Sequence, residues 1–166
     1  MTTEQAVFLR DFLLANMEKE VTATAKVLAA VPDGEASDYR PDPRSRSARE
    51  LAWHIAETDL QFFNSIASLK LAFTEEKNPT SNSAELVAYY EEGFRAALAR
   101  IRALSPEQLA QPVDFLGAFT FPNVTYLSML SSHSIHHRGQ LSTYLRAMGS
   151  KVPAIYGPSA DENSFE

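Results

Sequence analysis

The sequence contains no cysteine among its 166 residues. The chain therefore has no thiolate of its own for nucleophilic catalysis, no disulfide and no cysteine-based metal site. Secreted proteins of this size often carry disulfides, so their absence favours a cytoplasmic protein. The first stretch, MTTEQAVFLRDFLLANMEKE, carries acidic residues and no uninterrupted apolar run, which is not the pattern of a signal peptide.

The sequence also lacks a long apolar run and a basic cluster. No stretch approaches the roughly 20 apolar residues that a membrane-spanning helix needs. The net charge is −6, and the densest basic stretch, Arg44–Arg49, has three arginines beside Asp38 and Asp42. We therefore expect neither a nucleic acid nor a membrane surface as a partner.

Hydrophobic residues make up 45% of the chain, which is enough for one core in a single domain spanning residues 1–166. Apolar residues at three- and four-residue steps predict four long helices. Their approximate ranges are 4–31, 47–73, 83–104 and 122–148. A short extra helix is expected at 105–110.

The helix starts carry recognisable capping signals. SARE, at residues 47–50, predicts a capping box between Ser47 and Glu50, and Asn82 or Ser83 is the expected cap of the third long helix. Residues 111–121 show no strand-like alternation and are expected to form an irregular connection. The prediction is an all-α four-helix bundle with a short extra helix and an irregular C-terminal tail. The long loops leave the order of the helices open.

Three of the four histidines lie within HSIHHRGQ, residues 133–140. His133 and His137 are four residues apart, so both leave the same face of the predicted helix. Two imidazoles at this spacing suit one shared metal ion. His136 points about 100° away from His137 and is expected to be a neighbour of the site.

The fourth histidine, His54, lies at the border between the apolar stripe and a polar strip of the second helix. Spacing and composition alone leave two interpretations open. Either three histidines bind a metal, or each is a structural residue with a hydrogen-bonding partner.

Two segments, LAWHIAE and HSIHHRGQLSTYLRAMG, together with VPAIYGPSADE near the end of the chain, resemble the DinB-like superfamily of damage-inducible-type four-helix-bundle metalloproteins. The resemblance implies that His54, His133 and His137 bind one divalent transition metal ion, which is zinc or nickel among members. The family pattern does not need a histidine at position 136. The resemblance also implies a homodimer.

Characterised members of that superfamily include thiol-dependent transferases and isomerases that use small thiols such as bacillithiol or mycothiol. Three neutral imidazoles leave an open coordination position, as catalytic sites do. We therefore expect a metal-dependent thiol S-transferase acting on a small molecule, with a low-molecular-weight thiol as cosubstrate. The alternatives are a metal-dependent hydrolase and a non-catalytic metal-binding stress-response protein.

Weak catalytic candidates flank the histidines. Glu50 and Glu57 lie one turn on either side of His54, although a structural role is more common for such residues. Gln140 shares the face of His133 and His137 and is expected to contact the site or the substrate.

Two expectations concern packing around the site. Tyr156 and residues 157–162 are candidates for a lid over the metal. Gly139 removes a side chain where another helix could approach closely.

Overall fold

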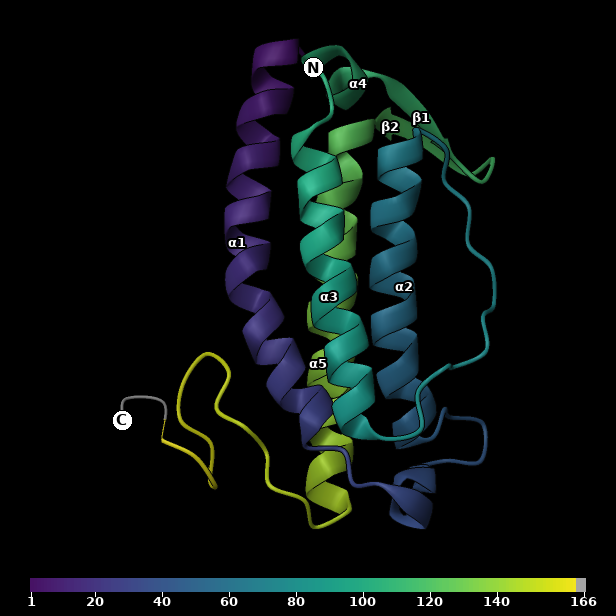
Figure 1. Ribbon diagram of the computed structural model, residues 1–166, viewed down its shortest axis with the longest axis vertical. Helices are drawn as coiled ribbons and strands as arrows, with labels where there is room; N and C mark the ends of the chain where they lie inside the picture. Colours follow the sequence, from purple (N-terminus) through teal and green to yellow (C-terminus); the bar gives the residue numbers. More distant parts are fainter. Residues whose placement is uncertain (164–166) are drawn as a thin grey trace.

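Four long helices form a bundle in the computed structural model, which describes residues 1–163 (Figure 1). In ring order, α1 packs against α3, α3 against α2, α2 against α5, and α5 against α1, around one shared apolar core. The predicted all-α four-helix bundle is confirmed. The helices are α1 (Thr3–Ala29), α2 (Ala48–Ser68), α3 (Ser83–Arg102), α5 (Tyr126–Ala147) and the expected short helix α4 (Pro106–Ala110).

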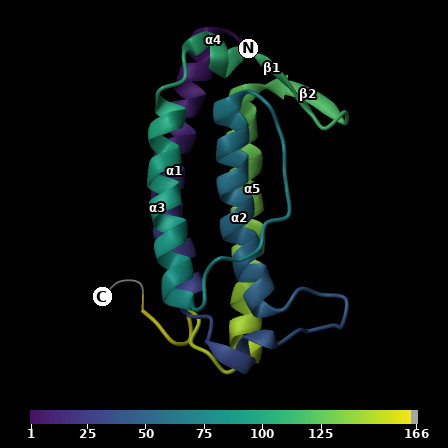
Figure 2. The ribbon, with the colours of Figure 1, turned by 45° about the vertical axis from the view of Figure 1, so that its right-hand side comes forward.

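A long crossover makes α2 and α3 run in the same direction. Residues 69–82 leave one end of α2 and travel back along the bundle to the opposite end, where α3 begins (Figures 1 and 2). The crossover lies along the outer side of α2, so it provides a wall beside that helix. The remaining loops include a 3-10 turn, η1 (Gly34–Asp38), between α1 and α2.

The predicted end of the second helix, near Phe73, is wrong, because α2 ends at Ser68. Leu69 adopts a left-handed conformation with φ 59°, and the Lys70 amide donates back to the Ser65 carbonyl at 3.1 Å. This is the hydrogen bond of a Schellman C-cap. The apolar residues that follow continue the helical period in the sequence but lie in the crossover.

The predicted capping box at the start of α2 is confirmed. Ser47 Oγ accepts from the Glu50 amide at 3.2 Å, and Glu50 Oε2 accepts from the Ser47 amide at 2.8 Å. Asn82 caps α3 by accepting from the Glu85 amide at 2.8 Å. The cap at Ser47 sets where α2 begins and therefore which residues of that helix face α5.

The expectation of an irregular connection at 111–121 is wrong. Strands β1 (Pro112–Phe115) and β2 (Phe119–Pro122) form an antiparallel hairpin that projects beside the bundle, with Phe115 opposite Phe119 (Figure 2). Leu116 and Gly117 both have positive φ, 52° and 79°. The turn between the strands has three residues, 116–118, and lacks the Asn-Gly or Asp-Gly pair that marks many hairpins, so the sequence gave no clear signal for it.

Tyr126, the first residue of α5, holds the hairpin. Its hydroxyl donates to the Val113 carbonyl at 2.7 Å and accepts from the Phe121 amide at 3.2 Å. Its ring stacks on Phe115 with a centroid distance of 5.8 Å. A 3-10 turn, η2 (Asn123–Thr125), joins β2 to α5. The hairpin is therefore attached to the helix that carries His133 and His137.

None of the helices within residues 1–163 is both long enough and apolar enough to cross a membrane.

The close helix approach expected at Gly139 is found instead at Gly93. A Cβ added at Gly139 would meet nothing within 4 Å, whereas one added at Gly93 would lie 2.6 Å from Leu60 Cδ1. Gly93 lies on α3 and Leu60 on α2, so the glycine allows these parallel helices to pack closely. Gly139 is exposed on α5.

We expect Gly93→Val to lower the free energy of unfolding by about 1–3 kcal/mol, because its side chain must displace Leu60. Gly139→Val is the matched control, since the same change in helix propensity there meets open space and is expected to alter stability by only a few tenths of a kcal/mol. Urea unfolding of both variants measures the difference. Equal stabilities would show that the α2–α3 contact does not need the glycine.

Candidate metal centre

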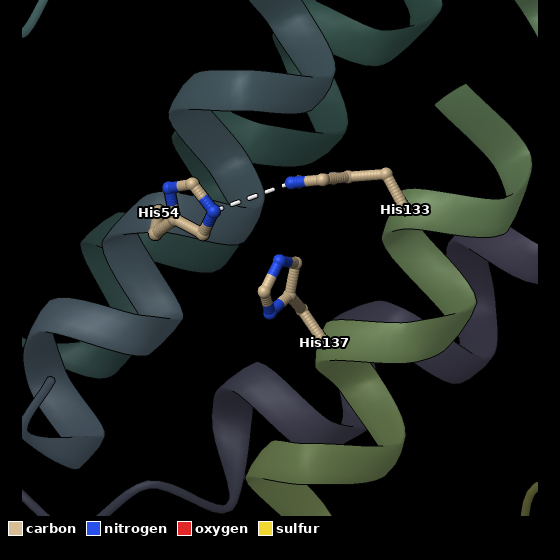
Figure 3. A group of neighbouring side chains, drawn as sticks. All are labelled: His54, His133 and His137. Carbon is tan, nitrogen blue, oxygen red and sulfur yellow. Dashed lines mark hydrogen bonds between the residues drawn. The ribbon is translucent and has the colours of Figure 1, made fainter. Parts of the chain in front are cut away.

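Three histidines from two packed helices meet at one point of the bundle (Figure 3). His54 comes from α2, and His133 and His137 come from adjacent turns of α5. One ring nitrogen from each lies within 4.8 Å of the others. The Nε2 atoms of His54 and His133 are 3.2 Å apart, and one ring nitrogen of His137 points toward the same space. The structure thus brings together the three residues that the sequence singled out.

His136 is not part of this group. It is exposed, and its ring contacts only the edge of the cluster through His137, at a centroid distance of 4.7 Å. This placement agrees with the helical wheel, which turned His136 away from the shared face.

Each of the three imidazoles has its Nδ1 held by a neighbouring side chain. Thr58 Oγ1 lies 3.1 Å from Nδ1 of His54, and Asp59 Oδ1 lies 3.4 Å from Nδ1 of His133. Gln140 Oε1 lies 3.0 Å from Nδ1 of His137. A carbonyl oxygen only accepts, so His137 carries its proton on Nδ1. With Nδ1 engaged outside the cluster, Nε2 is the atom left for a shared ligand.

The spacing of these nitrogens fits a transition metal. Two nitrogens each about 2.0–2.1 Å from a tetrahedral zinc ion are separated by about 3.3 Å. The 3.2 Å between the Nε2 atoms of His54 and His133 is close to this value. The donor set and its outer hydrogen bonds therefore suit a metal with nitrogen ligands.

Burial favours the neutral form of two of the imidazoles, those of His54 and His137. Desolvation lowers the pKa of His54 to about 4, and the positive charge of Arg46 and the other two histidines act in the same direction. Desolvation also lowers the pKa of His137, with a smaller opposing effect from the hydrogen bond to Gln140. His54 is therefore unprotonated at neutral pH, as a metal ligand must be.

Asp59 is a site residue that the sequence analysis missed. Its side chain is 1% exposed, and its Oδ2 accepts a hydrogen bond from the Tyr90 hydroxyl at 3.1 Å, while Oδ1 faces His133. Burial raises the pKa of Asp59, and hydrogen bonds from His133, Ser134 and Tyr90 oppose this shift. The available signal was an acidic residue four positions after Ile55, on the apolar face of the helix.

Two of the candidate catalytic residues hold parts of the site in place. Gln140 orients His137, as its hydrogen bond shows. Glu50 caps α2 and forms an ion pair with Arg40 at 2.7 Å, and the hydrogen bond from Arg40 lowers the pKa of Glu50. The contacts of Gln140 with His137 and of Glu50 with Arg40 direct these two side chains away from the space that the three histidines share.

Glu57, the third candidate, helps to fix the crossover. Its Oε1 accepts from the Glu76 amide and from Gln61, and Gln61 in turn bonds both the amide and the carbonyl of Thr74. Trp53 adds a hydrogen bond from Nε1 to the Glu76 carbonyl at 3.0 Å. Side chains of α2 thus hold residues 74–76 as a wall beside His54.

An open groove of about 780 Å³ lies between this wall, α2 and the hairpin, and reaches His54 and His133. The aromatic rings of Phe62, Phe73 and Phe115 line part of it, with centroid distances of 4.7 to 6.5 Å among them. The histidine cluster is therefore accessible to a small molecule from a partly aromatic groove.

The C-terminal tail does not form the expected lid, because none of residues 156–162 lines the groove. Tyr156 instead donates from its hydroxyl to Glu20 on α1 at 2.8 Å and accepts from Arg138. Arg138 is 2% exposed and forms an ion pair with Glu20 at 2.7 Å. The tail thus fastens α1 to the helix that carries His137.

Comparisons with known proteins agree with this architecture. The family model described as DinB family matches residues 1–164. The uncharacterized protein YrdA of Bacillus subtilis is 30% identical over 156 residues, covering 92% of this chain and 90% of that protein. The uncharacterized protein YjoA of the same organism is 31% identical over 116 residues, covering 67% and 73%.

Two crystal structures of DinB-like proteins share the fold. The structure from Bacillus cereus has a TM-score of 0.72 at 25% sequence identity, covering 87% of this chain and 95% of the other. The structure of YjoA from Bacillus subtilis has a TM-score of 0.70 at 23% identity, covering 86% and 96%.

We expect the untagged protein to bind one divalent transition metal ion per chain, and His54→Ala, His133→Ala and His137→Ala each to lose it, because two imidazoles alone form a weak site. His136→Ala is the matched control and should retain the metal. Elemental analysis after exhaustive dialysis measures the content. Equal trace amounts in the wild type and the His133→Ala/His137→Ala double variant would disprove the site.

Asp59→Asn should weaken zinc binding by roughly 10- to 100-fold, because the amide cannot supply the negative charge that makes His133 a stronger ligand. Competition with a chromogenic chelator measures the affinity, and circular dichroism checks that helix content is preserved. Asp114→Asn is the control, because the side chain of Asp114 lies on strand β1 and accepts from the Gly117 amide, and it should leave the affinity unchanged. An Asp59→Asn protein with wild-type affinity would show that the Asp59–His133 contact has no influence on the metal.

Proposed function

This chain belongs to the DinB family, and on that premise we propose that it is a metal-dependent enzyme of the thiol S-transferase type. The observation that carries the proposal is the convergence of three imidazoles beside an open groove in a chain that has no cysteine. Any sulfur nucleophile must therefore arrive with a small cosubstrate. The resemblance described in the sequence analysis implies the same class of reaction.

His54, His133 and His137 would hold the metal, and imidazole ligands suit zinc or nickel. A metal held by these histidines would supply Lewis acidity that lowers the pKa of a bound thiol, which would favour the thiolate at neutral pH. Thr58, Asp59 and Gln140 keep the three rings oriented through their Nδ1 atoms.

The groove would hold the second substrate. Phe62, Phe73 and Phe115 offer aromatic surface for the apolar part of an electrophile and exclude water from it. In the transfer, sulfur forms a bond to the electrophilic carbon while the bond from that carbon to the leaving group breaks. The leaving group departs with the electron pair, and the thiol proton passes to water.

A metal-dependent hydrolase is the second candidate, and the position of Glu57 favours it. Glu57 lines the same groove as His54, and only its Oε1 atom is engaged with Gln61 and the crossover. The Oε2 atom of Glu57 would act as the general base toward an attacking water molecule.

We also propose that the protein is a cytoplasmic homodimer. Phe8 and Phe12 on α1 are 73% and 56% exposed, and their rings stack at 6.4 Å. Two stacked aromatic rings on an exposed helix face favour burial against a second chain. Val27, another apolar residue of α1, is buried within the bundle and does not contribute to this face.

Metal-loaded protein should accelerate the conjugation of mercaptoethanol to chlorodinitrobenzene, and chelation or His54→Ala should abolish the acceleration. Absorbance of the thioether product measures the rate. His136→Ala is the control and should keep the wild-type rate. The same protein incubated with nitrophenyl acetate and no thiol tests the hydrolase.

The outcomes separate the three functional classes. Hydrolysis without thiol that is lost in Glu57→Gln would replace the transferase with the hydrolase. Stoichiometric metal with neither activity would favour a non-catalytic metal-binding protein.

A further inference from the structure

The groove beside the histidines differs in chemistry along its length. Phe62 on α2 and Phe73 on the crossover contribute to its aromatic part. Arg46 and Glu50 line it at the N-terminal end of α2. His54 lies between these two parts on α2. A ligand that reaches the histidines therefore meets aromatic surface on one side and charged groups on the other.

Arg46 has a free guanidinium among the described residues, unlike the other arginines of its segment. Arg40 pairs with Glu50, Arg44 with Asp42, and Arg49 with Asp38. Within residues 1–163, no carboxylate or carbonyl oxygen accepts a hydrogen bond from the guanidinium of Arg46. Arg46 lines the same groove as His54 and His133, so its charge lies on the approach to the histidine cluster.

None of the carboxylates that line the groove forms an ion pair with Arg46. Glu50 is neutralised by Arg40, and Glu57 is engaged with the crossover. Glu75 and Glu76 lie on the crossover wall. The acidic wall disfavours a ligand with several negative charges, whereas a single negative charge placed at Arg46 gains an unshared guanidinium.

We propose that Arg46 anchors the thiol cosubstrate, and that the groove therefore selects a small thiol that carries a carboxylate. This inference rests on the proposed transferase function. The carboxylate would bind Arg46, the sulfur would reach the three histidines, and the electrophile would occupy the aromatic part of the groove. The charged end of the thiol and the apolar electrophile would then bind on opposite sides of the reacting sulfur.

The test uses the full chain loaded with cobalt(II), because thiolate binding to this ion produces a charge-transfer band without any turnover. Three short thiols serve as probes: mercaptopropionate, mercaptoethanol and cysteamine, which are anionic, neutral and cationic. Dissociation constants are compared between proteins for each thiol separately, so that differences in thiol basicity cancel.

We expect Arg46→Gln to weaken mercaptopropionate binding by roughly two- to fivefold, because Arg46 is exposed and exposed ion pairs are weak, and to leave mercaptoethanol unchanged. Arg46→Glu should weaken mercaptopropionate further and strengthen cysteamine. Arg44→Gln, which removes an arginine two residues away and outside the groove, is the matched control and should change none of the three.

The outcomes distinguish this inference from the function on which it rests. If all three thiols bind and Arg46→Gln leaves the mercaptopropionate constant unchanged, the anchor is overturned and the transferase proposal stands. If no thiol produces the charge-transfer band, the transferase proposal itself is overturned, and the anchor with it.

Discussion

The packing of α2 against α5 is the contact on which the site depends, because each helix carries only part of the histidine cluster. α5 places His133 and His137 one turn apart, and α2 must bring His54 opposite them for the nitrogens to converge. A rotation of α2 by the angle of one residue, about 100°, would turn His54 away from α5. The capping box at Ser47 and the C-cap at Leu69 fix the ends of α2, so its register is set locally as well as by packing.

The buried pair of Asp59 and Tyr90 strengthens this contact in a way that apolar packing cannot. Asp59 on α2 touches His133 on α5, and Tyr90 on α3 donates to the same carboxyl group. Apolar side chains tolerate small displacements, whereas a buried carboxyl group leaves polar atoms without partners if the helices shift. The network therefore specifies one arrangement of three helices and also orients one histidine. Arg138 gives the opposite side of α5 a comparable attachment to α1.

The sequence was sufficient to predict features that depend on local periodicity. Helical spacing identified the bundle and separated His136 from His133 and His137, and the capping motif SARE located the cap at Ser47. It failed where tertiary contacts decide the structure. The end of α2 depends on a left-handed Leu69, and the hairpin depends on Tyr126 packing under two four-residue strands. Asp59 lies on the apolar face of its helix, which was a signal in the sequence, but its partners His133 and Tyr90 come from α5 and α3 and are known only once those helices are placed around it. The tail carried a family likeness, but its contact with Glu20 lies 136 residues away in the chain.

The positive charge of Arg46 affects both the protonation of His54 and the charge of the ligand that the site favours. The positive charge of Arg46 contributes to lowering the pKa of His54, so it helps to keep Nε2 of His54 unprotonated and able to bind a metal. The same cation favours a negative charge placed near the cluster, which is the charge that a thiolate brings. An acidic residue at position 46 would oppose both effects, since it would stabilise imidazolium and repel the thiolate. Metal binding by neutral imidazoles and thiolate binding are therefore both favoured by a positive charge at position 46, which the unpaired Arg46 at the end of the groove provides.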